Sequence, residues 1–355
     1  MRTVYLGTSD FAAAVLERLA GSAHRPALVV TRPDRPRGRG RKLAAPAVAD
    51  AARALGLELY QPENVNDEQA RARVAAVQPD AVCVCAFGAL LREPLLSEHE
   101  LINVHPSLLP RWRGAAPVER AIMAGDERTG VAIMRMEASL DTGPVYLLGE
   151  EPIAPDDTYG TLAARLQELA SGLLVRALDE RSPPADQSED GVTYADKIGP
   201  EDRTLDPQAP AEVNDRTVRA LTPHIGARAE LPGGSMLGVI RARIDEPGAH
   251  GPLRAEGGRL LLGGLELLEV QPAGGLPTTS SGASSIRAPT PTAPCTPKRA
   301  ASMPASGRSR CSWPTARSSA GSRWTISSRR SPARWSNSML RRARHCGSGS
   351  TSSSF

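Results

Sequence analysis

The stretch Thr3-Val4-Tyr5-Leu6-Gly7-Thr8-Ser9-Asp10-Phe11, near the start of the chain, decides the fold class. It begins with a short apolar run that ends at a glycine. The next three residues, Thr, Ser and Asp, are of types that often cap the N-terminus of a helix. The apolar residues of 11–20 then recur with helical spacing. We therefore predict a strand, a tight turn and a helix.

The same alternation continues through the first half of the chain. Short apolar runs recur at 27–30, 81–84 and 101–104, and helical patterns at 47–55 and 67–77 separate them. Strands that alternate with helices indicate an α/β fold with a Rossmann-like, mostly parallel sheet. Ligands of such sheets bind beyond the carboxyl ends of the strands. We expect the functional site at that edge.

The turn after Gly7 argues against a nicotinamide enzyme. The glycines of the G-x-G-x-x-G fingerprint, which let a pyrophosphate approach the backbone, are absent. Cys83 and Cys85 share one face of a predicted strand and have no second pair at metal-binding spacing. We interpret the two thiols as packing groups and expect no metal.

The composition of the chain limits the cellular compartment and the partners that we expect for the protein. The chain of 355 residues has no apolar run long enough for a membrane helix and no signal-peptide core at its start. Its five cysteines do not form the framework of a secreted protein. We expect a cytoplasmic protein with reduced thiols and no membrane partner.

The charge is divided unevenly along the chain. Of 43 basic and 39 acidic residues, thirteen basic and no acidic ones fall in 278–355, so the preceding part has a net charge of −9. That tail is rich in Ser and Arg and has no apolar period. One interpretation is a disordered basic arm for nucleic acid. The other, which we favour because Lys298 stands alone among arginines, is a frameshift near Pro277.

Candidate catalytic residues lie further along the chain. Asn103 and His105 lie two residues apart at the end of a predicted strand, so their side chains point to the same side. Asp141 follows in a loop between apolar runs at 131–136 and 145–148. Such an amide, imidazole and carboxylate could stabilise an oxyanion and move protons during acyl transfer. The alternative is a structural histidine and a turn-forming aspartate.

Several motifs together resemble the folate-dependent formyltransferases. The resemblance lies in Asn103-x-His105, Ser107-Leu108-Leu109-Pro110, Arg113-Gly114-Ala115-Ala116-Pro117 and Asp141-Thr142-Gly143. The turn at Gly7 and the basic loop Arg32–Lys42 narrow it to the branch of that family that acts on methionyl-tRNA. The resemblance covers roughly the first 276 residues.

The resemblance implies a reaction and a set of site residues. It implies formyl transfer from 10-formyltetrahydrofolate, as co-substrate and without metal, to the α-amino group of methionyl initiator tRNA, by a protein expected to be monomeric. The catalytic residues would be Asn103, His105 and Asp141. The folate-binding residues would be Phe87, Gly88, Ala89, Leu90, Ser107, Leu108, Leu109 and Pro110.

The basic loop is the expected RNA contact. It holds six basic residues in eleven, with glycines that allow a close approach to phosphates. A solvated flexible loop is the plainer interpretation. By the resemblance, Arg39 would discriminate the unpaired end of the initiator. The expected tRNA-binding residues are Arg35, Arg37, Arg39, Arg41 and Lys42.

The pattern also predicts how the domains are arranged. We expect a catalytic domain at 1–190, a linker at 191–204, and a C-terminal domain at 205–276. Its helix-like stretch and short apolar runs separated by glycines resemble an OB-like β-barrel that binds tRNA, here truncated. The tail at 277–355 would be of low complexity and disordered.

Three alternatives remain open. Phosphoribosylglycinamide formyltransferases would share the catalytic trio but lack the basic loop and the second domain. Formyltetrahydrofolate hydrolases would carry a regulatory domain before the catalytic one. The chain could also be a non-catalytic RNA-binding module or a pseudoenzyme disabled by its altered end.

Overall fold

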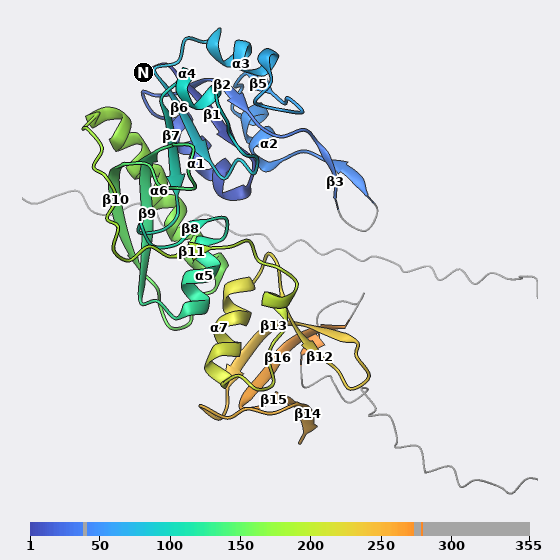
Figure 1. Cartoon of the computed structure of the whole chain (residues 1–355). Helices are drawn as coiled ribbons and strands as arrows, with labels where there is room; N and C mark the ends of the chain where they lie inside the picture. The colour runs from blue at the N-terminus through green and yellow to red at the C-terminus, as the bar shows by residue number, and fades with distance from the viewer. Residues whose placement is uncertain (38–40, 273–277, 280–355) are drawn as a thin grey trace, which may run out of the picture. The chain divides into compact units, whose positions relative to one another are not determined.

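The computed structural model describes residues 1–37, 41–272 and 278–279 (Figure 1). The first part of the chain alternates strands with helices. Its strands are β1 (Thr3–Gly7), β2 (Pro26–Val30), β3 (Arg35–Arg37), β4 (Lys42–Ala44), β5 (Leu59–Tyr60), β6 (Ala81–Cys85), β7 (Leu101–His105), β8 (Arg113–Gly114), β9 (Arg128–Arg135), β10 (Val145–Pro152) and β11 (Tyr194–Ala195). Its helices are α1 (Asp10–Ala20), α2 (Ala47–Ala54), α3 (Glu68–Ala75), α4 (Leu95–Glu98), α5 (Pro117–Ala124) and α6 (Tyr159–Glu180).

Within the described residues, seven strands form the main sheet, in the order β10-β9-β7-β6-β1-β2-β5. The five strands from β7 to β5 are parallel to their neighbours, whereas β9 and β10 are antiparallel. The predicted Rossmann-like, mostly parallel sheet is confirmed. Each predicted strand of this sheet is present, with ends that differ by a few residues.

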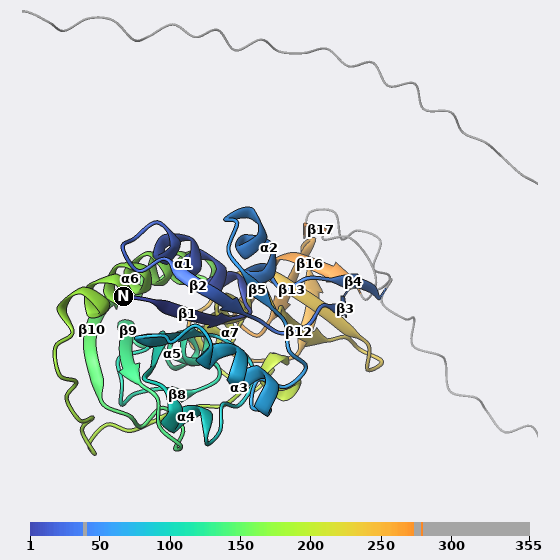
Figure 2. The same cartoon turned by 90° about the horizontal axis from the view of Figure 1, so that it is seen from above.

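The first turn forms as the sequence predicts. Ser9 caps α1, because its hydroxyl accepts a hydrogen bond from the backbone N–H of Ala12 at 3.2 Å. The apolar side of α1 packs with α6 against one face of the sheet, and α3 and α4 cover the other (Figure 2). The carboxyl ends of β1, β6 and β7 therefore share one edge of a buried sheet.

The C-terminal part forms a second, smaller sheet. It contains a 3-10 turn (Glu201–Arg203), α7 (Ala211–Leu221) and the strands β12 (Ala227–Glu230), β13 (Met236–Ile244), β14 (Leu253–Glu256), β15 (Arg259–Leu262), β16 (Leu265–Pro272) and β17 (Thr278–Thr279). Among the described residues, its antiparallel order is β12-β13-β16-β15-β14. Leucines and valines of this sheet close a separate core against α7. This agrees with the barrel-like fold predicted for the C-terminal part.

The expected linker and the expected tail each contain a short strand. The predicted linker at 191–204 contains a short strand, because β11 pairs in parallel with β8 and so joins the segment after β7. Of the predicted tail, Thr278 and Thr279 pair with Val270 and Glu269 of β16. Pro277 and the residues from 280 onward lie outside the described residues.

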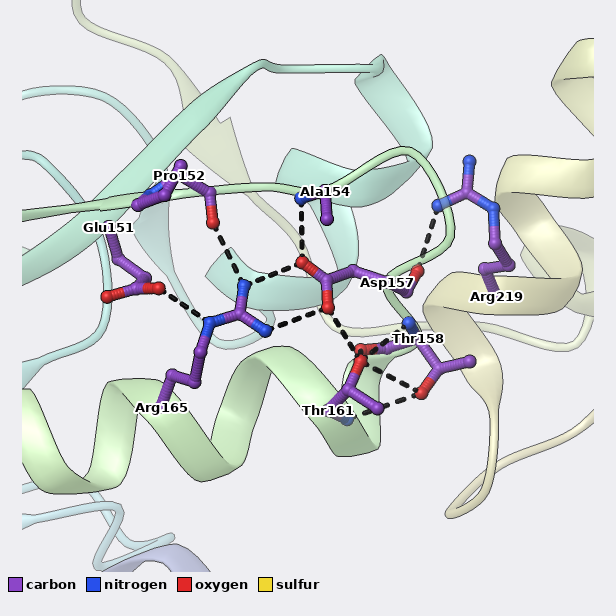
Figure 3. Close-up of polar contacts among 8 residues, drawn as sticks. All are labelled: Glu151, Pro152, Ala154, Asp157, Thr158, Thr161, Arg165 and Arg219. Carbon is purple, nitrogen blue, oxygen red and sulfur yellow. Dashed lines mark hydrogen bonds and ion pairs between the residues drawn. The ribbon is translucent and has the colours of Figure 1, made fainter.

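A charged cluster joins the start of α6 to α7 (Figure 3). Both carboxylate oxygens of Asp157 accept hydrogen bonds from Arg165, at 2.9 and 2.6 Å, and Arg165 also binds Glu151 at 2.6 Å. Arg219 of α7 donates to the backbone oxygen of Asp157 at 2.9 Å. Because the Arg165 guanidinium lies beside it, the pKa of Asp157 is lowered to about 2. The cluster ties α7 to the parallel-sheet part of the same compact unit.

Candidate active site

The end of β7 brings an amide and an imidazole into one cavity. Asn103 and His105 alternate with Val104, whose side chain packs in the core on the α1 side of the sheet. Asn103 and His105 both line a cavity of about 430 Å³ at the carboxyl end of β7. No described residue makes a hydrogen bond to the carboxamide of Asn103. The amide is therefore available to a ligand.

The segment after β7 fixes the ring of His105. Its Nε2 lies 2.8 Å from the backbone oxygen of Trp112. A carbonyl oxygen only accepts hydrogen bonds, so this ring nitrogen carries a proton. Ser107 closes the intervening turn, with its hydroxyl donating to the backbone oxygen of Arg111 at 2.6 Å. Nδ1 makes no hydrogen bond within the described residues.

Asp141 faces that second nitrogen. Its Oδ2 lies 3.7 Å from Nδ1 of His105 and accepts a hydrogen bond from the backbone N–H of Gly114 at 2.9 Å. The carboxylate is largely buried, and the backbone of Asp141 has a left-handed φ of 49°. The structure therefore brings all three residues of the predicted trio to one cavity.

Two residues that the sequence analysis did not single out hold the Asp141 loop. Gln187 donates from Nε2 to the backbone oxygens of Asp141 and Gly143, both at 2.8 Å. Arg113 in turn donates two hydrogen bonds to the amide oxygen of Gln187. Arg113 belonged to a quoted motif, but no local pattern marks Gln187, which lies 46 residues after Asp141.

Two glycines are required where backbones meet at this site. A Cβ on Gly143 would lie 2.0 Å from the backbone oxygen of Arg135, so only glycine lets the Asp141 loop lie against β9. A Cβ on Gly114, which has a φ of 125°, would lie 2.7 Å from the backbone oxygen of Ala195. Glycine at this position therefore lets β8 and β11 lie close together, beside the N–H that donates to Asp141.

The cavity joins the three strand ends to helices α1, α5 and α6. Its lining is apolar toward β6, polar at Asn103 and His105 of β7, and carries two carboxylates, those of Asp141 and Glu119. No lysine or arginine is among the described residues that line it. The lining consists of Ser9, Phe11, Val84, Cys85, Ala86, Phe87, Gly88, Ala89, Leu91, Asn103, Val104, His105, Pro106, Gly114, Ala115, Pro117, Val118, Glu119, Met136, Asp141 and Tyr159.

The predicted folate residues fall into two groups. Phe87, Gly88 and Ala89 line the cavity, and the hydroxyl of Thr8 holds their loop by donating to the backbone oxygen of Phe87 at 2.6 Å. Leu90 is exposed and is not among the lining residues. The segment 107–110 does not line the cavity either; it forms the turn that leads to Trp112.

The basic loop contains a hairpin. Strands β3 and β4 pair through Arg35 with Ala44 and Arg37 with Lys42, so part of the expected basic loop is paired strand. The hairpin projects away from the main sheet (Figure 1). Arg35, Arg41 and Lys42 are exposed, and Arg35 also lines a second cavity of about 370 Å³ that includes Ser9 and Asp10. Arg39 lies outside the described residues.

The two cysteines of β6 are accounted for by packing. Cys83 and Cys85 are buried free thiols in the core, and burial raises the pKa of each to about 12. The interpretation of these two as packing groups is confirmed.

In the described part of the chain, no three His, Cys, Asp or Glu side chains are placed to hold a metal ion. No helix there is long and apolar enough to cross a membrane.

Comparison with known proteins shows which family the chain belongs to. Residues 1–178 match the family model described as formyl transferase. The methionyl-tRNA formyltransferase of Halorhodospira halophila is 42% identical over 294 residues, which cover 79% of this chain and 94% of that protein. The chain belongs to the methionyl-tRNA formyltransferase family. The resemblance identified from the motifs is therefore confirmed.

Solved structures agree on the fold of this formyltransferase family member. The methionyl-tRNA formyltransferase of Clostridium thermocellum matches 77% of this chain and all of its own, with a TM-score of 0.51 and 13% identity. HypX of Aquifex aeolicus, solved in complex with tetrahydrofolic acid, matches 80% of this chain and 47% of its own, with a TM-score of 0.55 and 15% identity. At these identities the likeness is one of fold.

Proposed function

We propose that this protein transfers the formyl group of 10-formyltetrahydrofolate to the α-amino group of methionyl initiator tRNA, in the cytoplasm, for translation initiation. The observation that carries the proposal is the convergence of Asn103, His105 and Asp141 on one cavity in a chain of this family. The tetrahydrofolic acid bound by HypX, which has a similar fold, supports a folate donor.

We propose a task for each member of the trio. The neutral amine attacks the formyl carbon, and the free carboxamide of Asn103 donates a hydrogen bond to the oxygen that becomes negative. His105 is held by Trp112 through Nε2, so the proton that moves is on Nδ1, next to Asp141. A carboxylate at this position stabilises the protonated ring.

The reaction moves one proton from the amine to N10 of the folate. As the new carbon–nitrogen bond forms, the amine loses one proton, and as the bond to N10 breaks, that nitrogen gains one. We propose that the His105 and Asp141 pair supplies the proton to N10 and regains one from the amine through solvent. Besides the folate co-substrate, the aminoacyl acceptor and solvent, the step uses only side chains of this chain.

We also propose which part of the chain carries out catalysis and which parts bind the tRNA. The catalytic domain would be 1–190 and the linker 191–204, while 205–276 and the β3–β4 hairpin would bind the tRNA. The exposed, basic hairpin supports this division, since a body of net negative charge contacts RNA only through local basic patches. The folate would contact the loop of Phe87, with 107–110 shaping its border.

Formylation of charged tRNA tests the proposal. The purified chain should formylate methionyl initiator tRNA with 10-formyltetrahydrofolate, and ending the chain after Thr279 should leave the turnover within about twofold if the tail takes no part in the chemistry. Formyl transfer to another amine, with none to methionyl-tRNA, would contradict the proposed acceptor.

A further inference from the structure

Glu119 is a buried carboxylate that the mechanism above does not use. It lies in the first turn of α5 and lines the same cavity as the catalytic trio. Its Oε1 lies 2.8 Å from Nε2 of His224, and no hydrogen bond from a described residue reaches Oε2. A carboxylate in a first turn stabilises its own helix. That role does not require burial, which is costly for a charge with a free oxygen.

The partner of Glu119 comes from the C-terminal part of the chain. His224 follows α7, and its ring stacks on Tyr159 of α6, with the ring centres 3.7 Å apart. Tyr159 also lines the cavity. Burial, together with the negative charges of Glu119 and Asp10, raises the pKa of Tyr159 to about 12. The phenol is therefore neutral near pH 7, and Glu119 is the acidic group at this end of the cavity.

The charges that line the cavity indicate which substrate group Glu119 would bind. Two carboxylates and one imidazole line the cavity, and Asp141 is already bound to the Gly114 amide and faces His105. The charged groups of a folate are carboxylates, which a second acid would repel. In the proposed reaction, the one cationic group that enters this cavity is the α-ammonium of the aminoacyl ester. A buried carboxylate with a free oxygen fits that group.

We propose that Glu119 binds the α-ammonium group of the acceptor through Oε2, before that group releases a proton to solvent and attacks as the neutral amine, and that His224 is the positioning residue that holds Oε1. The inference rests on the proposed function and adds to it the acceptor end of the cavity. It also gives the C-terminal part of the chain a role in shaping the cavity, besides any contact with the tRNA body.

A pair of acceptors tests this without catalysis. Initiator tRNA is charged either with methionine or with its α-hydroxy analogue, and binding of each to the full chain is measured without donor at about pH 6, where an α-amino group is protonated. Wild-type protein should bind the methionyl form more tightly. Glu119→Gln, which keeps the shape and an acceptor for His224, should lose roughly tenfold or more for the methionyl form and less than about twofold for the hydroxy form.

Controls separate charge recognition from folding. Glu168→Gln, at an exposed position of α6, should keep the wild-type preference. His224→Ala should lose part of the preference and raise the KM for methionyl-tRNA more than it lowers kcat, and His224→Gln, which still offers a donor to Oε1, should restore both. Equal losses for the two acceptors in Glu119→Gln, or no preference in the wild type, would overturn the inference. Wild-type formylation is measured separately and decides only the proposed function.

Discussion

Nδ1 of His105 lies 3.7 Å from Oδ2 of Asp141, while the other ring nitrogen of His105 is bound to the backbone oxygen of Trp112. One nitrogen is thus fixed by the backbone, and the other faces a carboxylate that a separate loop supplies. The pair is the part of the site most directly suited to moving a proton.

Asp141→Asn should lower kcat at least about 100-fold, because the amide removes the charge that stabilises the protonated ring but still offers an oxygen to the Gly114 N–H. The KM for the donor should change little. Steady-state kinetics with both substrates checks this, and Glu137→Gln, at an exposed position four residues earlier, is the matched control. More than about a tenth of wild-type turnover in Asp141→Asn would contradict a proton-transfer role.

Gln187→Ala should lower kcat about tenfold without changing the KM for tRNA. The variant loses the two hydrogen bonds that hold the backbone oxygens of Asp141 and Gly143, so the carboxylate is less well placed. Gln208→Ala, in the C-terminal part, serves as control. If Gln187→Ala instead raised the KM for tRNA at constant kcat, Gln187 would belong to binding and not to positioning.

Much of this site follows from the sequence because its chemistry is local. Asn103 and His105 are two residues apart on a strand, so the period of a strand alone puts them on one side. The β-turn-α unit at Gly7 and Ser9 is likewise encoded by neighbouring residues. These features need no tertiary contact to be predicted.

Other features depend on distant contacts and could not be predicted. Gln187 reaches Asp141 only through the folded loop, and His224 reaches Glu119 across 105 residues. The pairing of Tyr194 with Arg113 made part of the expected linker a strand. Leu90, expected near the folate, follows Gly88 and Ala89 in sequence but is turned to solvent. Such outcomes are set by packing and not by local pattern.

Arg39→Ala should raise the KM for tRNA and weaken the preference for initiator over elongator methionyl-tRNA. The physical reason is the loss of a phosphate or base contact from the basic hairpin segment, which should also reduce the salt dependence of log KM by up to about one unit of slope. Kinetics at several salt concentrations with both tRNAs checks this. Arg176→Ala, exposed on α6, is the control, and unchanged discrimination in Arg39→Ala would count against the hairpin as the reader of the initiator.

Asp157→Asn should destabilise the protein near neutral pH but have little effect in strong acid. Since the Arg165 guanidinium holds the pKa of Asp157 at about 2, below its value in an unfolded chain, the stabilisation is fully present above about pH 4 and is lost as the pH falls through 2. Urea denaturation at pH 7 and about pH 3 should show a smaller difference between wild type and variant at the lower pH. A difference that does not change with pH would contradict the ion pair as its source.

The most direct test of the account compares formylation of methionyl initiator tRNA by the wild-type chain, Asn103→Ala and His105→Ala, with 10-formyltetrahydrofolate as donor. Loss of an oxyanion donor typically costs 10²–10³ in rate, so each variant should fall well below about a tenth of wild-type turnover while still binding tRNA. Turnover above that level in either variant, or no formylation by the wild-type chain, would contradict the proposed mechanism.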